Sequence, residues 1–230
     1  MTPTASTRDS SPPAMPGPVA LLSGMVAIDS VNRAISGNAA GEAALATHLH
    51  QQAIAMGLAV TRLPVNDLQF NLLIHSPQAK AGRPWLVFES HMDTVGVASM
   101  TIPPFDPVIR DGRIFGRGSC DTKGSGAAML WALHQHHRSL SSSNSDTANN
   151  VAILFTIDEE VSKQGVTHFI SHTLPTLPWR PSGVIVGEPT NLSPIIAHNG
   201  VVRWTIRTTG LAAHSSDPTR GRSAISMMLR

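Results

Sequence analysis

The sequence predicts an α/β fold: a mostly parallel, twisted sheet flanked by helices, followed by the beginning of a small α+β domain. Three observations predict it. Compact apolar runs such as 85–88 and 151–157 are typical of strands buried on both faces. Segments with apolar residues at three- and four-residue spacing alternate with these runs, as helices do in α/β folds. From Ile195 the pattern changes to strand-like runs of another kind, which indicates that the parallel sheet has ended.

The first part of the chain predicts a tail, two helices and two strands. Residues 1–18 carry repeated prolines among Ser and Thr, and such a composition does not offset the entropy cost of ordering, so we expect a disordered tail. Apolar spacing predicts helices over 20–31 and 41–56, which we expect to pack on one sheet. Short apolar runs predict strands over 58–63 and 71–75.

The middle of the chain continues the alternation. Residues 85–88 predict a buried strand that ends abruptly in Glu89, Ser90 and His91. A glycine-rich turn then opens a predicted helix over 123–137. Residues 139–150 are nearly all small or polar and predict an exposed loop. Two further apolar runs, 151–157 and 182–186, predict the remaining buried strands.

The last part of the chain predicts a second unit. Two strand-like runs occupy 195–209, and 224–229 resembles a helix that lacks a capping glycine or a polar end. We therefore expect a catalytic domain over 19–194, followed over 195–230 by a small domain of which the chain carries only the beginning.

The charge and cysteine content exclude several classes of protein. Lys and Arg number 17 against 15 Asp and Glu, and they are spread along the chain, so we expect no nucleic-acid partner. The apolar runs are too short or too interrupted to cross a bilayer and no secretory start is evident, so we expect no membrane partner. A single cysteine, Cys120, leaves no internal disulfide and fits a reducing compartment, which predicts a cytoplasmic protein.

The predicted strands end in histidine and carboxylate clusters. Ligands of open α/β sheets bind just beyond the carboxyl ends of the strands. The run 85–88 leads to His91, with Asp93 two residues later. A histidine that binds a metal commonly donates its other ring proton to such a carboxylate, which fixes the tautomer. We therefore interpret His91 as a ligand and Asp93 as the group that orients it.

Further carboxylates follow at the other predicted strand ends. Asp121 lies in the glycine-rich turn 116–124, the sequence Asp158, Glu159 and Glu160 follows one strand, and Glu188 follows another. Imidazole with carboxylates suits Zn²⁺, with Co²⁺ or Mn²⁺ as substitutes. Two such ions activate water for hydrolysis. Asp158 is assigned no role.

In their order these motifs resemble a known family, the metal-dependent deacylases and exopeptidases that include acetylornithine deacetylase, succinyl-diaminopimelate desuccinylase, aminoacylase and carboxypeptidase G. The resemblance covers about residues 20–230, and the segments 187–190 and 214–218 look most like acetylornithine deacetylase. The matching segments are Ser90–Val95, Gly116–Gly124, Asp158–Glu160, Gly187–Thr190 and Ala213–Pro218.

The resemblance implies two zinc ions and their ligands. His91, Asp121 and Glu188 would bind one zinc ion. Asp121 would bridge to the second ion, and Glu160 would bind that ion. The family's last ligand is a histidine near the end of a longer chain, and no residue of this sequence matches it, which leaves the second metal site incomplete.

The resemblance also implies the catalytic groups and the partners. Glu159 would be the general base, and Asp93 would orient His91. His214 would lie in the dimerisation or lid domain and stabilise the oxyanion in a partner's active site. The substrate would be an N-acyl amino acid or a small peptide, and the assembly a homodimer. One departure is Ser223, where relatives more often have Asn.

Alternative interpretations of the same segments are weaker. Cys120 lacks a histidine positioned to activate it, so we interpret it as a packing residue. The segment 116–126 lacks the Gly-Lys-Ser order of a phosphate loop. His168 and His172 have the spacing of helical zinc proteases, but Phe169 occupies the place of their glutamate base. The alternative function is an impaired fragment or pseudo-enzyme that keeps a single metal site.

Overall fold

The computed structural model describes residues 17–142, 149–202 and 204–229, and the chain divides into two compact units, Met1–Asn191 and Leu192–Arg230. Almost all of the predicted tail and half of the predicted loop over 139–150 lie outside the described residues. Within those residues, no helix combines the length and apolar character needed to cross a membrane.

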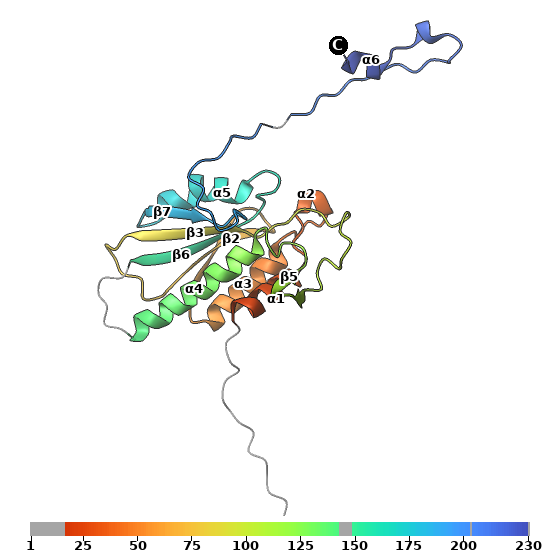
Figure 1. The fold of residues 1–230 in the computed structure, drawn as a ribbon. Coiled ribbons are helices and arrows are strands. Elements are labelled where there is room, and N and C mark those ends of the chain that lie inside the picture. Colours follow the sequence, from red (N-terminus) through yellow and green to blue (C-terminus); the bar gives the residue numbers. More distant parts are fainter. Residues whose placement is uncertain (1–16, 143–148, 203, 230) are drawn as a thin grey trace, which may run out of the picture. The chain divides into compact units, whose positions relative to one another are not determined.

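The first unit is built on a five-stranded mixed sheet (Figure 1), which confirms the α/β class. β3 pairs in parallel with β6 and with β7, whereas β2 pairs antiparallel with β1 and with β6, so the sheet has more antiparallel pairing than predicted. In spatial order the strands are β1 (Ala59–Pro64), β2 (Phe70–His75), β6 (Asn150–Thr156), β3 (Trp85–His91) and β7 (Pro181–Val186).

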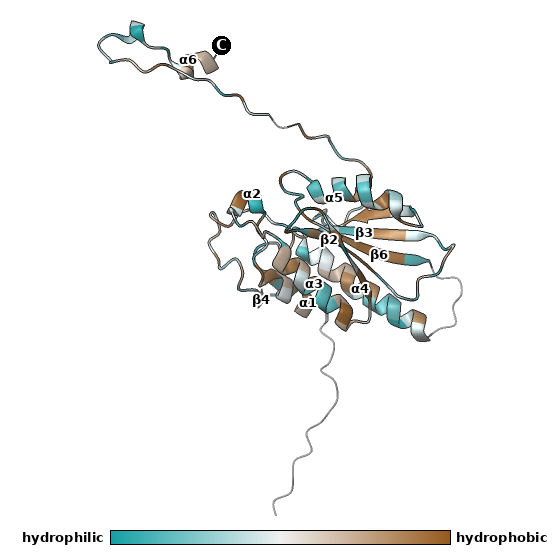
Figure 2. Cartoon of the chain, turned by 180° about the vertical axis from the view of Figure 1, so that it is seen from behind, coloured by the Kyte–Doolittle hydropathy of each residue, from teal (hydrophilic) through white to brown (hydrophobic). Residues whose placement is uncertain are grey.

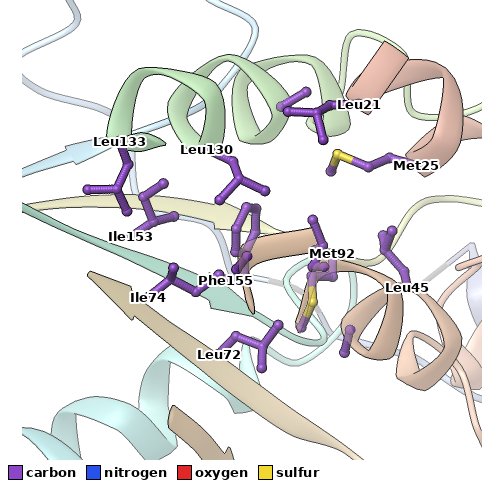
Figure 3. Packing of buried hydrophobic residues seen from close by; sticks show 14 of the residues in the cluster. Leu21, Met25, Leu45, Leu72, Ile74, Met92, Leu130, Leu133, Ile153 and Phe155 are labelled. Atoms are coloured by element: carbon purple, nitrogen blue, oxygen red, sulfur yellow. The ribbon is translucent and has the colours of Figure 1, made fainter. Parts of the chain in front are cut away.

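Three helices cover one face of this sheet: α1 (Pro18–Val26), α3 (Ala43–Ala55) and α4 (Lys123–Ser142). The main hydrophobic core lies between them and the strands (Figure 3). In Figure 2 the strands are largely brown, whereas the helices show both brown and teal, as expected for elements with one buried side. The labelled core residues are Leu21, Met25, Leu45, Leu72, Ile74, Met92, Leu130, Leu133, Ile153 and Phe155.

Short helical segments cover the other face, where Phe169 and Trp179 pack against Trp85 and its neighbours. The rings of Trp85 and Trp179 are stacked with centroids 4.2 Å apart. These helices were not predicted from the sequence, because segments of three to five residues hold too few turns to show a period. They are α5 (Gln164–His168), the π-helix η1 (Phe169–Thr173) and the 3-10 helix η2 (Leu174–Thr176).

A hairpin that lies outside the five-stranded sheet was also not predicted from the sequence. β4 (Val108–Arg110) pairs antiparallel with β5 (Arg113–Phe115). The two residues between them, Asp111 and Gly112, have φ values of 51° and 72°, the conformation that an Asp-Gly hairpin turn requires. This dipeptide was therefore the sequence signal for the hairpin. A short helix, α2 (Arg33–Ser36), precedes α3.

The second unit contains little regular structure. It holds the 3-10 helix η3 (Pro218–Arg220), the helix α6 (Ala224–Met228) and an isolated bridge between Leu211 and Arg222. The helix predicted over 224–229 is thus present. The strands predicted over 195–209 are wrong, since the described residues of that range form none. An apolar run becomes a strand only when another strand supplies hydrogen-bond partners.

Candidate metal centre

The topology of the sheet brings the predicted ligands to one edge. In the parallel pair of β3 and β6, His91 lies opposite Thr156, so residues 91–94 and 157–160 leave the sheet side by side. β7 is also parallel to β3 and pairs Val186 with Glu89, so Glu188 leaves at the same edge.

Three ligand groups converge there. The His91 Nε2 atom lies 3.2 Å from Asp121 Oδ1 and 3.8 Å from Glu188 Oε1, and the ligand atoms of the three residues all lie within 4.8 Å of one another. Tetrahedral zinc with ligands at about 2.1 Å separates neighbouring ligand atoms by about 3.4 Å. The donor types and their spacing therefore fit a zinc ion. Within the described ranges, this is the one group of three or more such residues.

The histidine of this group is oriented by the backbone and side chain of Asp93. The His91 Nδ1 atom lies 2.9 Å from the Asp93 carbonyl oxygen and 3.4 Å from Oδ1, which leaves Nε2 to face Asp121 and Glu188. Burial alone would lower the pKa of the His91 imidazole, but its hydrogen bond to Asp93 and the nearby carboxylates, including Glu188, raise that pKa to about 10. The site favours a positive charge at this position.

Asp93 also holds the turn that carries two predicted site residues. It is fully buried, and its carboxylate accepts hydrogen bonds of 3.0 Å from the backbone N–H groups of Glu159 and Glu160. A third bond of 2.8 Å comes from the Asn32 side chain. Burial would raise the pKa of Asp93, but the bonds from His91, Asn32 and Glu160 lower it, so the carboxylate stays ionised.

The loop that carries Asp121 is anchored by the buried side chain of Lys123. Its Nζ atom donates to the carbonyl oxygens of Met25 and Ile28 over 3.0 and 2.9 Å, and burial lowers its pKa to about 8. The loop turns at Gly118, where φ is +79° and a Cβ would lie 2.8 Å from a neighbouring side chain. A glycine is therefore required at this turn.

Glu188 is placed by the segment that follows β7. Gly187 donates to the Glu89 carbonyl oxygen over 2.8 Å and accepts a 2.7 Å bond from Ser125 Oγ. The side chains of Asp121 and Glu188 are 52% and 41% exposed. Burial and then repulsion from Asp121 raise the pKa of Glu188, against the opposing effect of His91.

The two glutamates of the acidic turn, which comprises Asp158, Glu159 and Glu160, differ in their contacts. The carboxylate of Glu159 pairs with Lys163, four residues later. Glu160 is close enough to His91 and Asp121 to interact with their charges, and its pKa is raised first by burial and then by the acidic neighbours. It is not a member of the three-residue ligand group.

His214 belongs to the other unit, Leu192–Arg230. It is exposed, and its Nδ1 atom lies 2.7 Å from Ser216 Oγ. Its role in binding an oxyanion stays a prediction.

Sequence reasoning assigned no role to several buried polar residues around this centre. Asn32 and Glu42 are 0% exposed and Asp158 is 7% exposed. Asn32 donates to Asp93 and to Asp158, and Glu42 accepts from the Asp158 N–H. Asn32 alone carried a weak signal, because Asn is favoured at the residue before a helix, and its side chain does accept a hydrogen bond from the Ala34 N–H at the start of α2.

Comparison with known proteins gives consistent matches. A family model described as peptidase family M20/M25/M40 matches residues 87–220. An acetylornithine deacetylase of Yersinia pseudotuberculosis is 34% identical over 220 residues, covering 93% of this chain and 54% of that protein. A probable carboxypeptidase of Aspergillus terreus is 37% identical over 173 residues, covering 73% of this chain and 36% of that protein.

The fold has matches among solved structures as well. A crystal structure of an M20 family metallo-carboxypeptidase from Sulfolobus solfataricus aligns with a TM-score of 0.57 at 19% identity, over 75% of this chain and 37% of that one. At this identity the likeness shows a shared fold. The chain spans about half or less of the length of the relatives it matches.

Proposed function

The chain belongs to the M20/M25/M40 peptidase family, and on that premise we propose that it takes part in the metal-dependent hydrolysis of amide bonds in N-acyl amino acids or small peptides. The convergence of His91, Asp121 and Glu188 at one sheet edge is the observation that carries the proposal. Titratable groups with shifted pKa values gathered at a strand end are typical of catalytic sites.

The proposed ions are zinc, with Co²⁺ or Mn²⁺ as substitutes. His91, Asp121 and Glu188 would hold one ion. Asp121 would bridge to a second ion held by Glu160, whose carboxyl senses the charge of Asp121. When bound, such ions acidify water and polarise a carbonyl oxygen.

The protein groups supply orientation and proton transfer. Asp93 holds the Nδ1 side of His91 and keeps Nε2 facing the ligand group. Glu159 would accept the proton of the attacking water and pass it to the departing amine nitrogen. Its backbone is fixed by Asp93, while its side chain is a third exposed and pairs with Lys163, so the carboxylate can exchange this partner for a substrate.

The finer assignments are a substrate like N-acetylornithine and a role for the second unit. The similarity to acetylornithine deacetylase over nearly the whole chain supports the first. We further propose that residues 195–230 begin a dimerisation domain and that exposed His214 stabilises the oxyanion in a partner's active site of a cytoplasmic homodimer.

A second candidate is an impaired enzyme that keeps a single metal site. One observation favours it: among the described residues, the ligand group contains the donors for one ion, and Glu160 is not part of it.

Metal content and turnover measured on this chain test both candidates. The protein is loaded with zinc, freed of excess metal and assayed by elemental analysis and by deacylation of N-acetylornithine and related N-acyl amino acids. Two zinc ions with turnover support the amidohydrolase. One zinc ion without turnover supports the single-site alternative, and no zinc contradicts both.

A matched variant pair shows where the metal binds. His91→Ala should weaken zinc binding more than about 100-fold, the upper end of what even outer-shell partners contribute. His134→Ala is the control, because His134 is also buried and its Nδ1 atom also lies near a backbone carbonyl oxygen, that of Met56 at 3.2 Å. Equal zinc affinity of the two variants would place the metal elsewhere.

A further inference from the structure

A group of buried polar side chains is linked by hydrogen bonds to the acidic turn. Asn32, Glu42 and Asp93 are 0% exposed, and Asp158 is 7% exposed. These residues come from three distant parts of the sequence. Burying amides and carboxyls costs free energy unless each is paired, so their gathering at one place calls for a physical explanation.

Asn32 is the centre of this group. Its Nδ2 atom donates to Asp93 Oδ2 and to Asp158 Oδ1, each over 2.8 Å. Its Oδ1 atom accepts a 2.9 Å bond from the Ala34 backbone, and its own N–H donates to the Thr94 carbonyl oxygen over 2.9 Å. The side-chain amide thus bridges two carboxylates that would repel each other, and its position is itself fixed by backbone contacts.

Asp158 turns the chain out of β6. Its φ is +60°, a left-handed conformation that a residue other than glycine adopts only with support. The support is visible: its N–H donates to Glu42 Oε1 over 3.2 Å, and its Oδ2 atom accepts a bond from Ser162 Oγ. Glu42 is held in turn by the Gln69 side chain.

The next two residues are the proposed base and second-metal ligand. Their N–H groups both donate to the Asp93 carboxylate, Glu159 to Oδ1 and Glu160 to Oδ2, and Oδ2 is also the atom that accepts from Asn32. We propose that Asn32, with Glu42 and Asp158, is a positioning residue that sets the direction in which Glu159 and Glu160 leave the backbone. This inference deepens the proposed function and rests on it for the roles of the two glutamates.

Hydrogen exchange tests the scaffold without any metal. In Asn32→Ala the backbone amides of Glu159 and Glu160 should exchange about tenfold faster, because Asp93 loses a bond of typical strength and its hold on the turn loosens. The control is Asn150→Ala. Asn150 is 5% exposed, lies at the other end of β6 and makes two side-chain bonds of 2.9 and 2.8 Å to the Lys80 backbone.

Both variants are compared at the same interval below their own unfolding temperatures, which removes the effect of general destabilisation. Faster exchange confined to the turn in Asn32→Ala supports the proposal. Equal exchange of these two amides in the two variants overturns it.

A second measurement, Co²⁺ affinity, separates the effect of the Asn32 hydrogen bonds from the effect of its side-chain shape. Asn32→Asp keeps the size of the side chain but removes both donors. Co²⁺ affinity should fall about 10- to 100-fold in Asn32→Ala and in Asn32→Asp alike, as when outer-shell partners of a metal are lost, and stay unchanged in Asn150→Ala. Wild-type affinity in Asn32→Asp would show that shape alone is needed and would overturn the proposal.

The two readouts also distinguish the possible failures. If the wild-type chain binds no Co²⁺, the proposed function fails, while the exchange of the Glu159 and Glu160 amides still decides whether the scaffold holds the turn.

Discussion

The two halves of the candidate metal centre are held in different ways. One half consists of His91, Asp93 and the acidic turn, and each of its main groups is fixed by buried donors or acceptors. The other half consists of Asp121 and Glu188, whose carboxylates are about half exposed and lie 3.2 and 3.8 Å from the His91 Nε2 atom. The buried half is thus held by several protein contacts, whereas the two carboxylates of the exposed half face the His91 imidazole.

This difference separates stability from metal binding. Carboxylates held by several donors have lowered pKa values, as at Asp93, and removing them leaves buried donors unsatisfied. Carboxylates that are partly buried beside other acidic groups have raised pKa values, as at Glu188, where burial is the larger cause and repulsion from Asp121 adds to it, and they gain by binding a cation. Substitutions in the buried half should therefore cost folding free energy, and those in the exposed half should cost metal affinity.

The largest expected effect is that of Asp93→Ala. The change leaves the donors of Asn32, Glu159 and Glu160 without their acceptor and leaves the His91 charge unpaired. The free energy of unfolding should fall by about 3–5 kcal/mol, measured by urea denaturation of the metal-free protein. Asp121→Ala is the control and should change it by less than about 0.5 kcal/mol. Similar losses of folding free energy in Asp93→Ala and Asp121→Ala would show that the two halves do not differ in their contribution to stability.

The next largest expected effect is a pH dependence of the free energy of unfolding, caused by Glu42. Burial raises its pKa from 4.5 to about 7. The folded state therefore holds this proton more tightly than the unfolded state, so its contribution is fully present below pH 4.5 and is lost as pH rises through 7. Between these limits the contribution falls by about 3 kcal/mol.

Glu42→Gln cannot lose this proton and should flatten the pH profile. The measurement is the free energy of unfolding of wild type and variant at pH 4.5 and about pH 8, without metal. The wild type should lose more stability than the variant as the pH rises. Parallel profiles would mean that Glu42 is already ionised in the folded protein.

The ligand group was predictable because its signals are local. His91 and Glu188 follow apolar strands, and the carboxyl ends of parallel strands meet at one edge whatever the details of the fold. β3 and β6 were predictable because burial on both faces leaves continuous apolar runs. β7 forms a strand as predicted, but it is not buried, since Val184, Ile185 and Val186 are 55%, 48% and 55% exposed. Family resemblance added the roles of the individual side chains.

The scaffold was not predictable because its contacts are distant in sequence. Asn32 bonds to Asp93 and Asp158 across 61 and 126 positions, and Glu42 bonds to the Asp158 backbone across 116. A single Asn or Glu in a polar segment is ordinary, and only tertiary packing makes it a buried partner. The strands expected over 195–209 failed for a related reason, since strand formation depends on a pairing partner as well as on composition.

A smaller effect is expected for the anchor of the exposed half. Lys123→Met removes the donor to the carbonyl oxygens of Met25 and Ile28 but keeps a buried side chain of similar length. The free energy of unfolding should fall by about 1–3 kcal/mol, the range for losing hydrogen bonds from a charged group. Zinc affinity should fall as well, because the loop of Asp121 loses its support. Stability measured by urea denaturation and zinc affinity measured by calorimetry should therefore fall together. A fall in stability alone would show that the support of the loop does not affect zinc binding.

The smallest change in the free energy of unfolding is expected at Glu159, a residue with a fixed backbone and a partly exposed side chain. Its backbone N–H belongs to the buried half, but its side chain is 33% exposed and pairs with Lys163, which is 56% exposed. Solvent screens such a pair, so Lys163→Gln and Glu159→Gln should each change the free energy of unfolding by less than about 0.5 kcal/mol in urea denaturation. A loss above about 1 kcal/mol in either variant would mean that the carboxylate is part of the folded framework. It would then not be the free group that proton transfer requires.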